Sequence, residues 1–133
     1  MKALVVDDFI CRKVLQTILS RLGECDVAVD GSEALEAFRI AIEEKSPYDL
    51  VCLDIMMPGM DGHEVLREIR EIEVSAGVGG LDGVKVVMTT ALDGFEDVRL
   101  AFRDQCDGYL VKPLDRKALL DPLRSLALVP AES

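Results

Sequence analysis

The chain has 133 residues, of which 50% are hydrophobic and 30% are charged, and its net charge is −10. This length suits one domain with a single core, and no apolar run reaches the roughly 18 residues of a membrane-spanning helix. The acidic excess argues against nonspecific attraction to DNA or to an anionic membrane, since lysine and arginine drive both. The first residues, MKALVVDD, are too short of apolar side chains for a signal peptide, so we expect a soluble cytoplasmic protein.

The cysteines of the chain are Cys11, Cys25, Cys52 and Cys106, and no two of them form a C-x-x-C pair. Cys52 lies in an apolar run of strand length, where a thiol commonly behaves as a small hydrophobic side chain. We therefore expect the cysteines to be reduced and structural.

Apolar runs of strand length alternate with segments of helical periodicity along the whole chain. Steps of three and four between apolar residues predict one-sided helices, and short continuous apolar runs predict buried strands. In chain order the expected elements are strand 3–6, a helix with apolar positions 11–22, strand 25–29, a helix with apolar positions 35–42, strand 50–53, a helix with apolar positions 65–72, strand 84–88, a helix near 94–103, strand 108–111 and a helix near 115–126.

This alternation of strands and helices predicts an α/β fold with a five-stranded parallel sheet and five helices, which cover both faces of the sheet. We assign residues 1–128 to this domain and residues 129–133 to a short C-terminal tail. Two features interrupt the pattern. The stretch SAGVGGLDG, residues 75–83, is rich in glycine and predicts a loop, and Pro122 should kink or split the last helix because it removes a backbone donor.

Right-handed crossovers bring the carboxyl ends of all parallel strands to one edge, where open α/β sheets bind their ligands. Polar residues follow four of the expected strands, namely Asp7 and Asp8, Asp54, Thr89 and Thr90, and Lys112 before Pro113. Converging carboxylates repel one another by about 4 kcal/mol for a pair about 4 Å apart at an effective dielectric of about 20. Either one acid keeps a proton, or a hard divalent cation such as Mg²⁺ lies among them.

With a metal, the ammonium of Lys112 and the hydroxyl of Thr90, this edge can bind a phosphoryl group on Asp54 from three sides. A carboxylate that forms an aspartyl phosphate is an established covalent nucleophile. Taken singly, Asp8 could be only a helix cap, and a strand-end threonine or a surface lysine needs no function. Their coincidence at successive strand ends favours the site.

The polar strand ends lie within longer stretches that resemble the receiver domain of two-component response regulators, including the single-domain chemotaxis regulator. The matching stretches are VVDD at 5–8, LDIMMPGMDG at 53–62, TA at 90–91 and YLVKP at 109–113. The resemblance covers residues 2 to about 128. It implies a doubly wound, flavodoxin-like sheet with strand order 2-1-3-4-5, an order that the chemotaxis regulator itself exemplifies.

For the acidic residues, the resemblance implies that Asp54 accepts a phosphoryl group from the phosphohistidine of a sensor histidine kinase or a phosphotransfer protein. Asp8, Asp54 and the backbone carbonyl of Met56 would ligate Mg²⁺, and Asp7 would act largely through water. The chain would catalyse its own phosphorylation and dephosphorylation, but it would not turn over free substrates.

For the remaining site residues, the resemblance implies that Lys112 pairs with the phosphoryl oxygens and is aimed by a cis bond before Pro113. Thr90 would move to hydrogen-bond the phosphoryl group, and Tyr109 would turn inward behind it. This switch would shift the face made by the fourth helix, the fifth strand and the fifth helix, and so control an unidentified downstream protein. Whether phosphorylation drives a homodimer stays open.

Two other functions compete with this interpretation. A phosphohydrolase with an aspartyl nucleophile would want a second acid two residues after Asp54, where this chain has Met56. A degenerate receiver would only bind protein, and the intact set of acids, threonine and Lys112 argues against it.

The self-dephosphorylation rate is a prediction of the sequence alone. In the family, the side chains two residues beyond Asp54 and two beyond Thr90 flank the path of the attacking water, and here they are the apolar Met56 and Leu92. Neither can orient water well, so the phosphorylated form should decay slowly in a time course followed by intact mass. A short half-life that Met56→Asn lengthened would contradict this.

Overall fold

The structure of the protein, a computed structural model, describes residues 1–55, 57, 59–78, 83–90, 106–112 and 114–128. Strands and helices alternate in it as the sequence predicts. They are β1 (Lys2–Val6), α1 (Phe9–Leu19), β2 (Glu24–Ala28), α2 (Gly31–Glu43), β3 (Leu50–Asp54), α3 (Gly62–Ser75), β4 (Lys85–Thr90), β5 (Gly108–Val111) and α5 (Arg116–Ser125). The helix expected near residues 94–103 lies outside the described residues.

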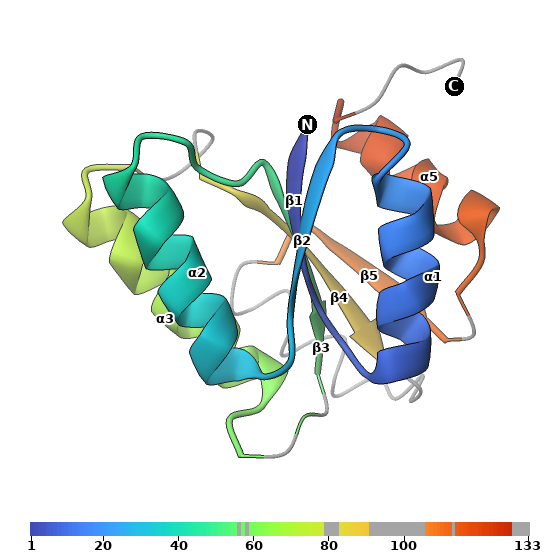
Figure 1. The fold of residues 1–133 in the computed structure, drawn as a ribbon, viewed down its shortest axis with the longest axis horizontal. Coiled ribbons are helices and arrows are strands. Elements are labelled where there is room, and N and C mark those ends of the chain that lie inside the picture. Colours follow the sequence, from blue (N-terminus) through green and yellow to red (C-terminus); the bar gives the residue numbers. More distant parts are fainter. Residues whose placement is uncertain (56, 58, 79–82, 91–105, 113, 129–133) are drawn as a thin grey trace.

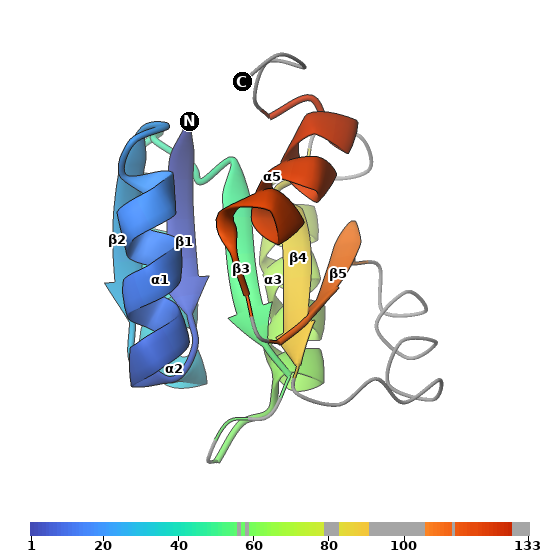
Figure 2. The same ribbon diagram turned by 90° about the vertical axis from the view of Figure 1, so that its right-hand side faces the viewer.

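The strands form one parallel sheet of five strands in the order β2-β1-β3-β4-β5, which confirms the predicted doubly wound topology. The helices α1 and α5 cover one face of the sheet, and α2 and α3 cover the other (Figure 1). Figure 2, in which the sheet faces the viewer, shows the strands running in the same direction, so their carboxyl ends share one edge.

The core consists of two layers, one on each face of the sheet, because successive strand residues point to opposite faces. In β1, Leu4 and Val6 belong to the layer under α2 and α3, whereas Ala3 and Val5 belong to the layer under α1 and α5. All four side chains are fully buried, as is Cys52 in β3. Central parallel strands are covered on both faces, which is why these segments read as continuous apolar runs. The cysteines are free, as expected.

Each described helix begins directly after an aspartate whose side chain accepts a hydrogen bond from the backbone N–H three residues later. Such N-caps typically stabilise a helix by about 1 kcal/mol each, since they satisfy an otherwise unpaired donor. Part of the acidic excess of the chain therefore serves helix initiation. The four caps are Asp8, Asp30, Asp61 and Asp115, with donor–acceptor distances of 2.9, 2.8, 3.0 and 2.7 Å.

Pro122 does not split α5, so that part of the sequence-based expectation is wrong. The helix runs without a break through the proline to Ser125. Three leucines on its inner side, Leu119, Leu120 and Leu123, are buried against the sheet. This burial offsets the one backbone hydrogen bond that the proline removes close to the end of the helix.

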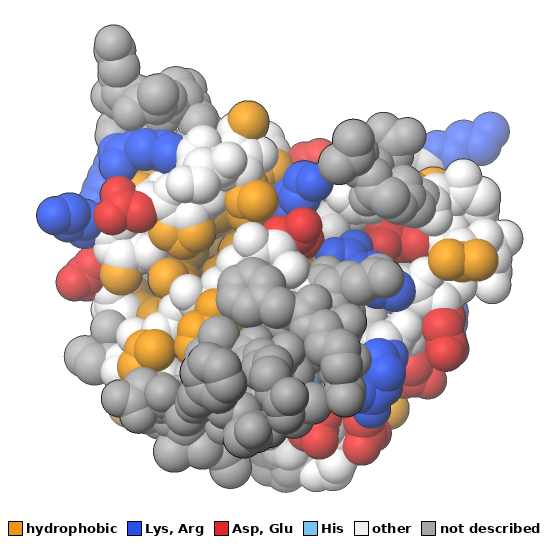
Figure 3. Space-filling model, turned by 180° about the vertical axis from the view of Figure 1, so that it is seen from behind, with side chains coloured by type: hydrophobic (Ala, Val, Ile, Leu, Met, Phe, Trp, Pro, Cys, Tyr) orange, Lys and Arg blue, Asp and Glu red, His pale blue; other side chains and the backbone are white. Residues whose placement is uncertain are grey.

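Seen from behind, acidic and basic side chains are interspersed over the described surface, and hydrophobic side chains gather on the side of α5 (Figure 3). The net negative charge of the chain is therefore not a continuous acidic field on the described part of this face. None of the described helices combines the length and the apolar character that a membrane crossing requires.

A partly buried ionic cluster fastens α3 to the starting ends of β4 and β5. Arg70 donates to Glu73 Oε1 and to the Val84 carbonyl, both at 2.8 Å, and to Asp107 Oδ2 at 3.0 Å. The acids in turn accept backbone N–H groups, from Val84 at 2.6 Å and from Val86 at 2.8 Å. Glu73 is only 3% exposed, and its charge is matched by donors on both carboxylate oxygens.

Removing the Glu73 carboxylate should destabilise the fold strongly. Glu73→Ala leaves the Arg70 guanidinium and the Val84 N–H without this partner, so we expect the free energy of unfolding to fall by about 3 kcal/mol in urea denaturation. Glu71→Ala changes an exposed glutamate on the same helix and should shift stability by less than about 0.5 kcal/mol. Equal effects of the two substitutions would show that the cluster contributes no special stability.

Candidate functional site

The carboxyl ends of the strands bring the polar residues singled out in the sequence to one edge. Asp7 directly follows β1, Asp54 ends β3, and Lys112 directly follows β5. In the strand register, Asp54 lies beside Thr89, and Thr90 lies beside the residue that precedes Lys112. The edge of the sheet therefore places acids from the first and third strands opposite a base from the last.

The Lys112 ammonium lies at the centre of this edge and contacts three carboxylates. Its Nζ is 2.7 Å from Asp7 Oδ1, 2.9 Å from Asp8 Oδ2 and 3.2 Å from Asp54 Oδ2. Burial alone would lower the pKa of Lys112, but its hydrogen bonds to Asp7 and Asp8 and the charges of Asp7 and Asp54 raise it. The stabilisation from this raised pKa is complete below the ordinary value of 10.5 and is lost only at higher pH.

Asp7 is held in one orientation by donors on both oxygens. Oδ2 accepts a 2.7 Å hydrogen bond from the Thr89 hydroxyl, and Oδ1 accepts the Asp8 backbone N–H at 2.7 Å besides the ammonium of Lys112. Asp7 is 4% exposed and Thr89 is fully buried. This role of Thr89 was not predicted from the sequence, although Thr89 has the strand parity of Val87, which faces the same side of the sheet as Asp7.

Asp8 serves both the helix and the site. Its Oδ1 caps α1 by accepting the Cys11 backbone N–H at 2.9 Å, while its Oδ2 binds Lys112. The backbone hydrogen bond from Cys11, followed by the hydrogen bond from Lys112, lowers the pKa of Asp8 to about 2. The resulting stabilisation is present above the ordinary pKa of 3.8 and disappears as the pH falls through about 2. The helix-cap interpretation is thus confirmed alongside the position in the site.

Three side chains of the described residues lie close enough together to hold one cation. Ligand atoms of Asp7, Asp8 and Cys11 all lie within 4.8 Å of one another. The two carboxylates provide the oxygen donors that Mg²⁺ prefers. Burial, and next the charge of Asp7, raises the pKa of Cys11, so its thiol stays neutral and is a poor ligand for this hard ion. The charge excess of the site, three carboxylates against one ammonium, also suits a cation.

Cys11 was not recognised as a neighbour of the site from the sequence. It is the third residue after the Asp8 cap, and a cap holds this residue close to its own carboxylate. Asp54 does not belong to the three-residue cluster but joins the site through Lys112. The backbone carbonyl of Met56, an expected ligand, lies outside the described residues.

The turn after β3 brings the chain back against the backbone of Asp54. Gly62 donates to the Ile55 carbonyl at 2.8 Å, and a Cβ at Gly62 would collide with the Asp54 carbonyl and Ile55. Gly59 adopts φ +80°, which glycine accepts without strain. Glycines at these two positions therefore let α3 begin immediately beside Asp54, which is itself 5% exposed.

Two expected switch residues lie at or near this edge. Thr90 is fully buried at the end of β4, and Tyr109 in β5 is half-buried and packs against the core layer under α2 and α3. The peptide before Pro113, expected to be cis, lies outside the described residues. The switch motion of Thr90 and Tyr109 stays a prediction.

Replacing the central ammonium should destabilise the protein. Lys112→Met leaves three converging carboxylates unneutralised, so we expect the free energy of unfolding at pH 7 to fall by about 2 kcal/mol. The loss should shrink on acidification, because protonated carboxyls no longer repel one another. Urea denaturation against pH would measure this, with the exposed Lys117→Met on α5 as the control. A pH-independent loss, or an equal loss for Lys117→Met, would contradict the prediction.

Comparisons with known proteins agree with this geometry. The family model of the response regulator receiver domain matches residues 3–124. The chain is 38% identical over 129 residues to the chemotaxis protein CheY of Treponema pallidum, covering 94% of this chain and 81% of that protein. Among solved structures, the CheX-CheY-BeF3-Mg²⁺ complex from Borrelia burgdorferi superimposes with a TM-score of 0.80 at 30% identity, covering 97% of this chain and 90% of that one.

The matches also include a longer curated protein and a receiver domain of a histidine kinase. The regulatory protein VanRB of Enterococcus faecalis is 36% identical over 120 residues, which cover 90% of this chain but only 48% of VanRB. The receiver domain of the histidine kinase CKI1 from Arabidopsis thaliana, complexed with Mg²⁺ and BeF3⁻, is 32% identical with a TM-score of 0.79, covering 96% of this chain and 90% of that one. The chain thus spans about half of the length of VanRB, and a smaller share of some longer curated relatives that it matches. With its fold, its acidic edge and these matches, the chain belongs to the response regulator receiver domain family of two-component signalling.

Proposed function

We propose that this receiver is a phosphoryl-accepting switch in which Asp54 takes the phosphoryl group from the phosphohistidine of a sensor histidine kinase or a phosphotransfer protein. The observation that carries the proposal is the Lys112 ammonium, which lies 3.2 Å from the Asp54 carboxylate and is held in place by Asp7 and Asp8. The complexes of the CKI1 receiver domain and of Borrelia CheY with Mg²⁺ and BeF3 support it, since BeF3 is an analogue of a phosphoryl group.

The residues of the site can account for the transfer. A carboxylate oxygen of Asp54 attacks phosphorus, one P–O bond forms and the P–N bond to the histidine breaks, with the electron pair left on the imidazole nitrogen. The ammonium of Lys112 lies where it can pair with the phosphoryl oxygens. The hydrogen bonds that Asp7 accepts from Thr89 and Lys112 keep this ammonium in position.

The acidic excess of the site also fits the expected Mg²⁺. Asp7 and Asp8, with Asp54 beside them, would hold the ion through oxygen donors. When bound there, Mg²⁺ neutralises the carboxylates and stabilises charge on the phosphoryl oxygens. The phosphorylated site would then act through Thr90 and Tyr109 on β5 and α5, and so control a protein partner rather than turn over a free substrate.

Intact mass after incubation with acetyl phosphate tests the acceptor role. With Mg²⁺ the wild type should gain one phosphoryl group, and Asp54→Asn should gain none. Asp49→Asn provides a matched control, because Asp49 precedes the other end of β3. Omitting Mg²⁺ should reduce the gain at least about tenfold, since the carboxylates then repel the incoming phosphate.

A wild type that gains no phosphoryl group from acetyl phosphate or from a panel of autophosphorylated sensor kinases would contradict the proposal and favour a protein-binding receiver without phosphorylation. An unchanged gain in Asp54→Asn would place the acceptor elsewhere. Transfer of radiolabel from one kinase of the panel to the wild type, but not to Asp54→Asn, would identify the donor class.

A further inference from the structure

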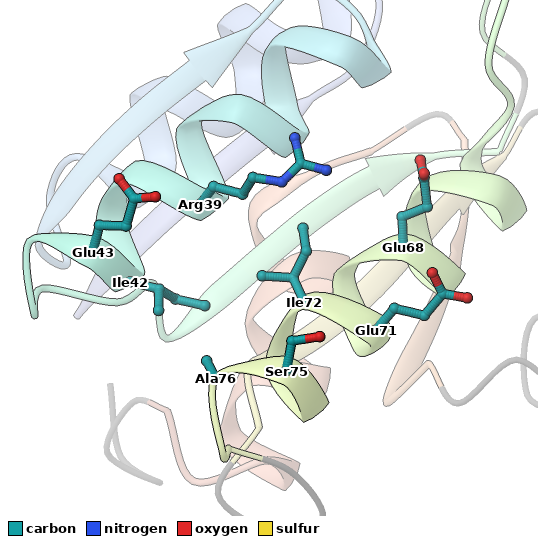
Figure 4. Close-up of a pocket in the computed structure, with 8 residues that line it drawn as sticks. All are labelled: Arg39, Ile42, Glu43, Glu68, Glu71, Ile72, Ser75 and Ala76. Carbon is teal, nitrogen blue, oxygen red and sulfur yellow. The ribbon is translucent and has the colours of Figure 1, made fainter.

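A groove separates the C-terminal halves of α2 and α3, with a volume of about 460 Å³ (Figure 4). Its middle is apolar and formed by Ile42 and Ile72, which also pack against the core layer beneath. The helices α2 and α3 begin at the edge of the sheet that carries Asp54 and run away from it. The groove therefore lies near the opposite edge of the sheet (Figure 1). A molecule bound in the groove would therefore leave Asp54 accessible.

The sides of the groove are predominantly acidic. Glu43 on α2 and Glu68 and Glu71 on α3 contribute three carboxylates, against the single guanidinium of Arg39. Figure 4 shows Arg39 and Glu43 on one side, Glu68 and Glu71 on the other, and the two isoleucines between them. The groove thus combines an apolar centre with a net charge that attracts cations.

One oxygen of these carboxylates has no hydrogen-bond donor among the described residues. The Oε2 atom of Glu68 is shielded from water, yet no described residue bonds to it. A desolvated carboxylate oxygen without a donor is unfavourable, and more so when it carries charge. A cation of a bound molecule would remove this cost once the Glu68 side chain turned its Oε2 toward the groove.

We propose that the groove is a docking site for a short basic segment of a partner protein, one that carries aliphatic side chains between lysines or arginines. The aliphatic side chains would pack on Ile42 and Ile72, and the cations would pair with Glu68 and the flanking glutamates. Because this site is remote from Asp54, docking does not require phosphorylation. The site goes beyond the phosphoryl-accepting function and does not depend on it.

Backbone amide NMR with a defined probe tests the docking site. The probe is the acetylated and amidated hexapeptide with the sequence RKLLKR, titrated at about 150 mM salt, where long-range attraction is largely screened. Saturable shifts should concentrate on amides of 39–43 and 68–76. A control peptide with both leucines replaced by asparagine should bind at least about fivefold more weakly, because it loses the apolar contact.

Two matched pairs of variants distinguish binding in the groove from general attraction between the basic probe and the acidic protein. Ser75 lines the groove, whereas the adjacent Val74 is 75% exposed and does not line it, so Ser75→Arg and Val74→Arg add the same charge at different places. The first should weaken probe binding about fivefold and the second less than about twofold. Likewise Glu68→Gln should weaken binding about fivefold, and Glu36→Gln, an exposed glutamate of α2 outside the groove, less than about twofold.

The stability of the variants is measured separately from their binding, so that a loss of binding cannot be mistaken for a loss of folding. An added cation at the end of α3 complements the helix dipole, and urea denaturation should show that both arginine variants keep their stability. Shifts scattered over the acidic surface, equal weakening within either pair, or equal affinity of the asparagine peptide would overturn the docking site. Concentration-dependent shifts at the groove without peptide would show that a second copy of the chain occupies it, and would also overturn the proposal.

Discussion

The contact of one ammonium with three carboxylates constrains the rest of the structure. Asp7 and Asp54 are almost fully buried at the edge of the sheet, and their charges could not stay there without a cation. Lys112 supplies it from a position 105 residues away from Asp7 in the sequence. The first, third and fifth strands must therefore end at the same edge, which a parallel sheet with right-handed crossovers achieves. Fold and site thus satisfy the same electrostatic requirement.

The sequence predicts most of the fold because burial on both faces leaves a strong signal. β1 and β3 are central strands, and their unbroken apolar runs mark them within one residue of their ends. β4 extends past its expected end to Thr90, since its two threonines are buried polar residues that an apolar pattern cannot detect. The strand order is not encoded in periodicity and came from the family resemblance. Helix starts follow from their aspartate caps, whereas the continuation of α5 through Pro122 depends on tertiary burial.

The site was predictable to the extent that its residues stand at strand ends. Asp7, Asp8, Asp54 and Lys112 converge as expected, because chain direction alone brings them to one edge. The contact of Thr89 with Asp7 and the position of Cys11 were not predicted, for different reasons. The role of Thr89 depends on which face of β4 it occupies. The position of Cys11 depends on the cap hydrogen bond, in which the Asp8 carboxylate accepts the backbone N–H of the third residue after it. Neither relation appears in a list of motifs, although both follow from strand parity and cap geometry.

Helix α3 connects the two ends of the molecule and is fastened at both. Its first residue, Gly62, lies against the backbone of Asp54, and its second half is tied to β4 and β5 through Arg70 and Glu73. A change of charge at Asp54 therefore meets a helix that has little freedom to shift along its axis. The groove between α2 and α3 lies on this fixed part of the molecule, whereas Thr90 and Tyr109 lie on the β4 and β5 side. A partner docked on the fixed side would keep its position in both states of the proposed switch, and could present a second surface to the β4 and β5 side.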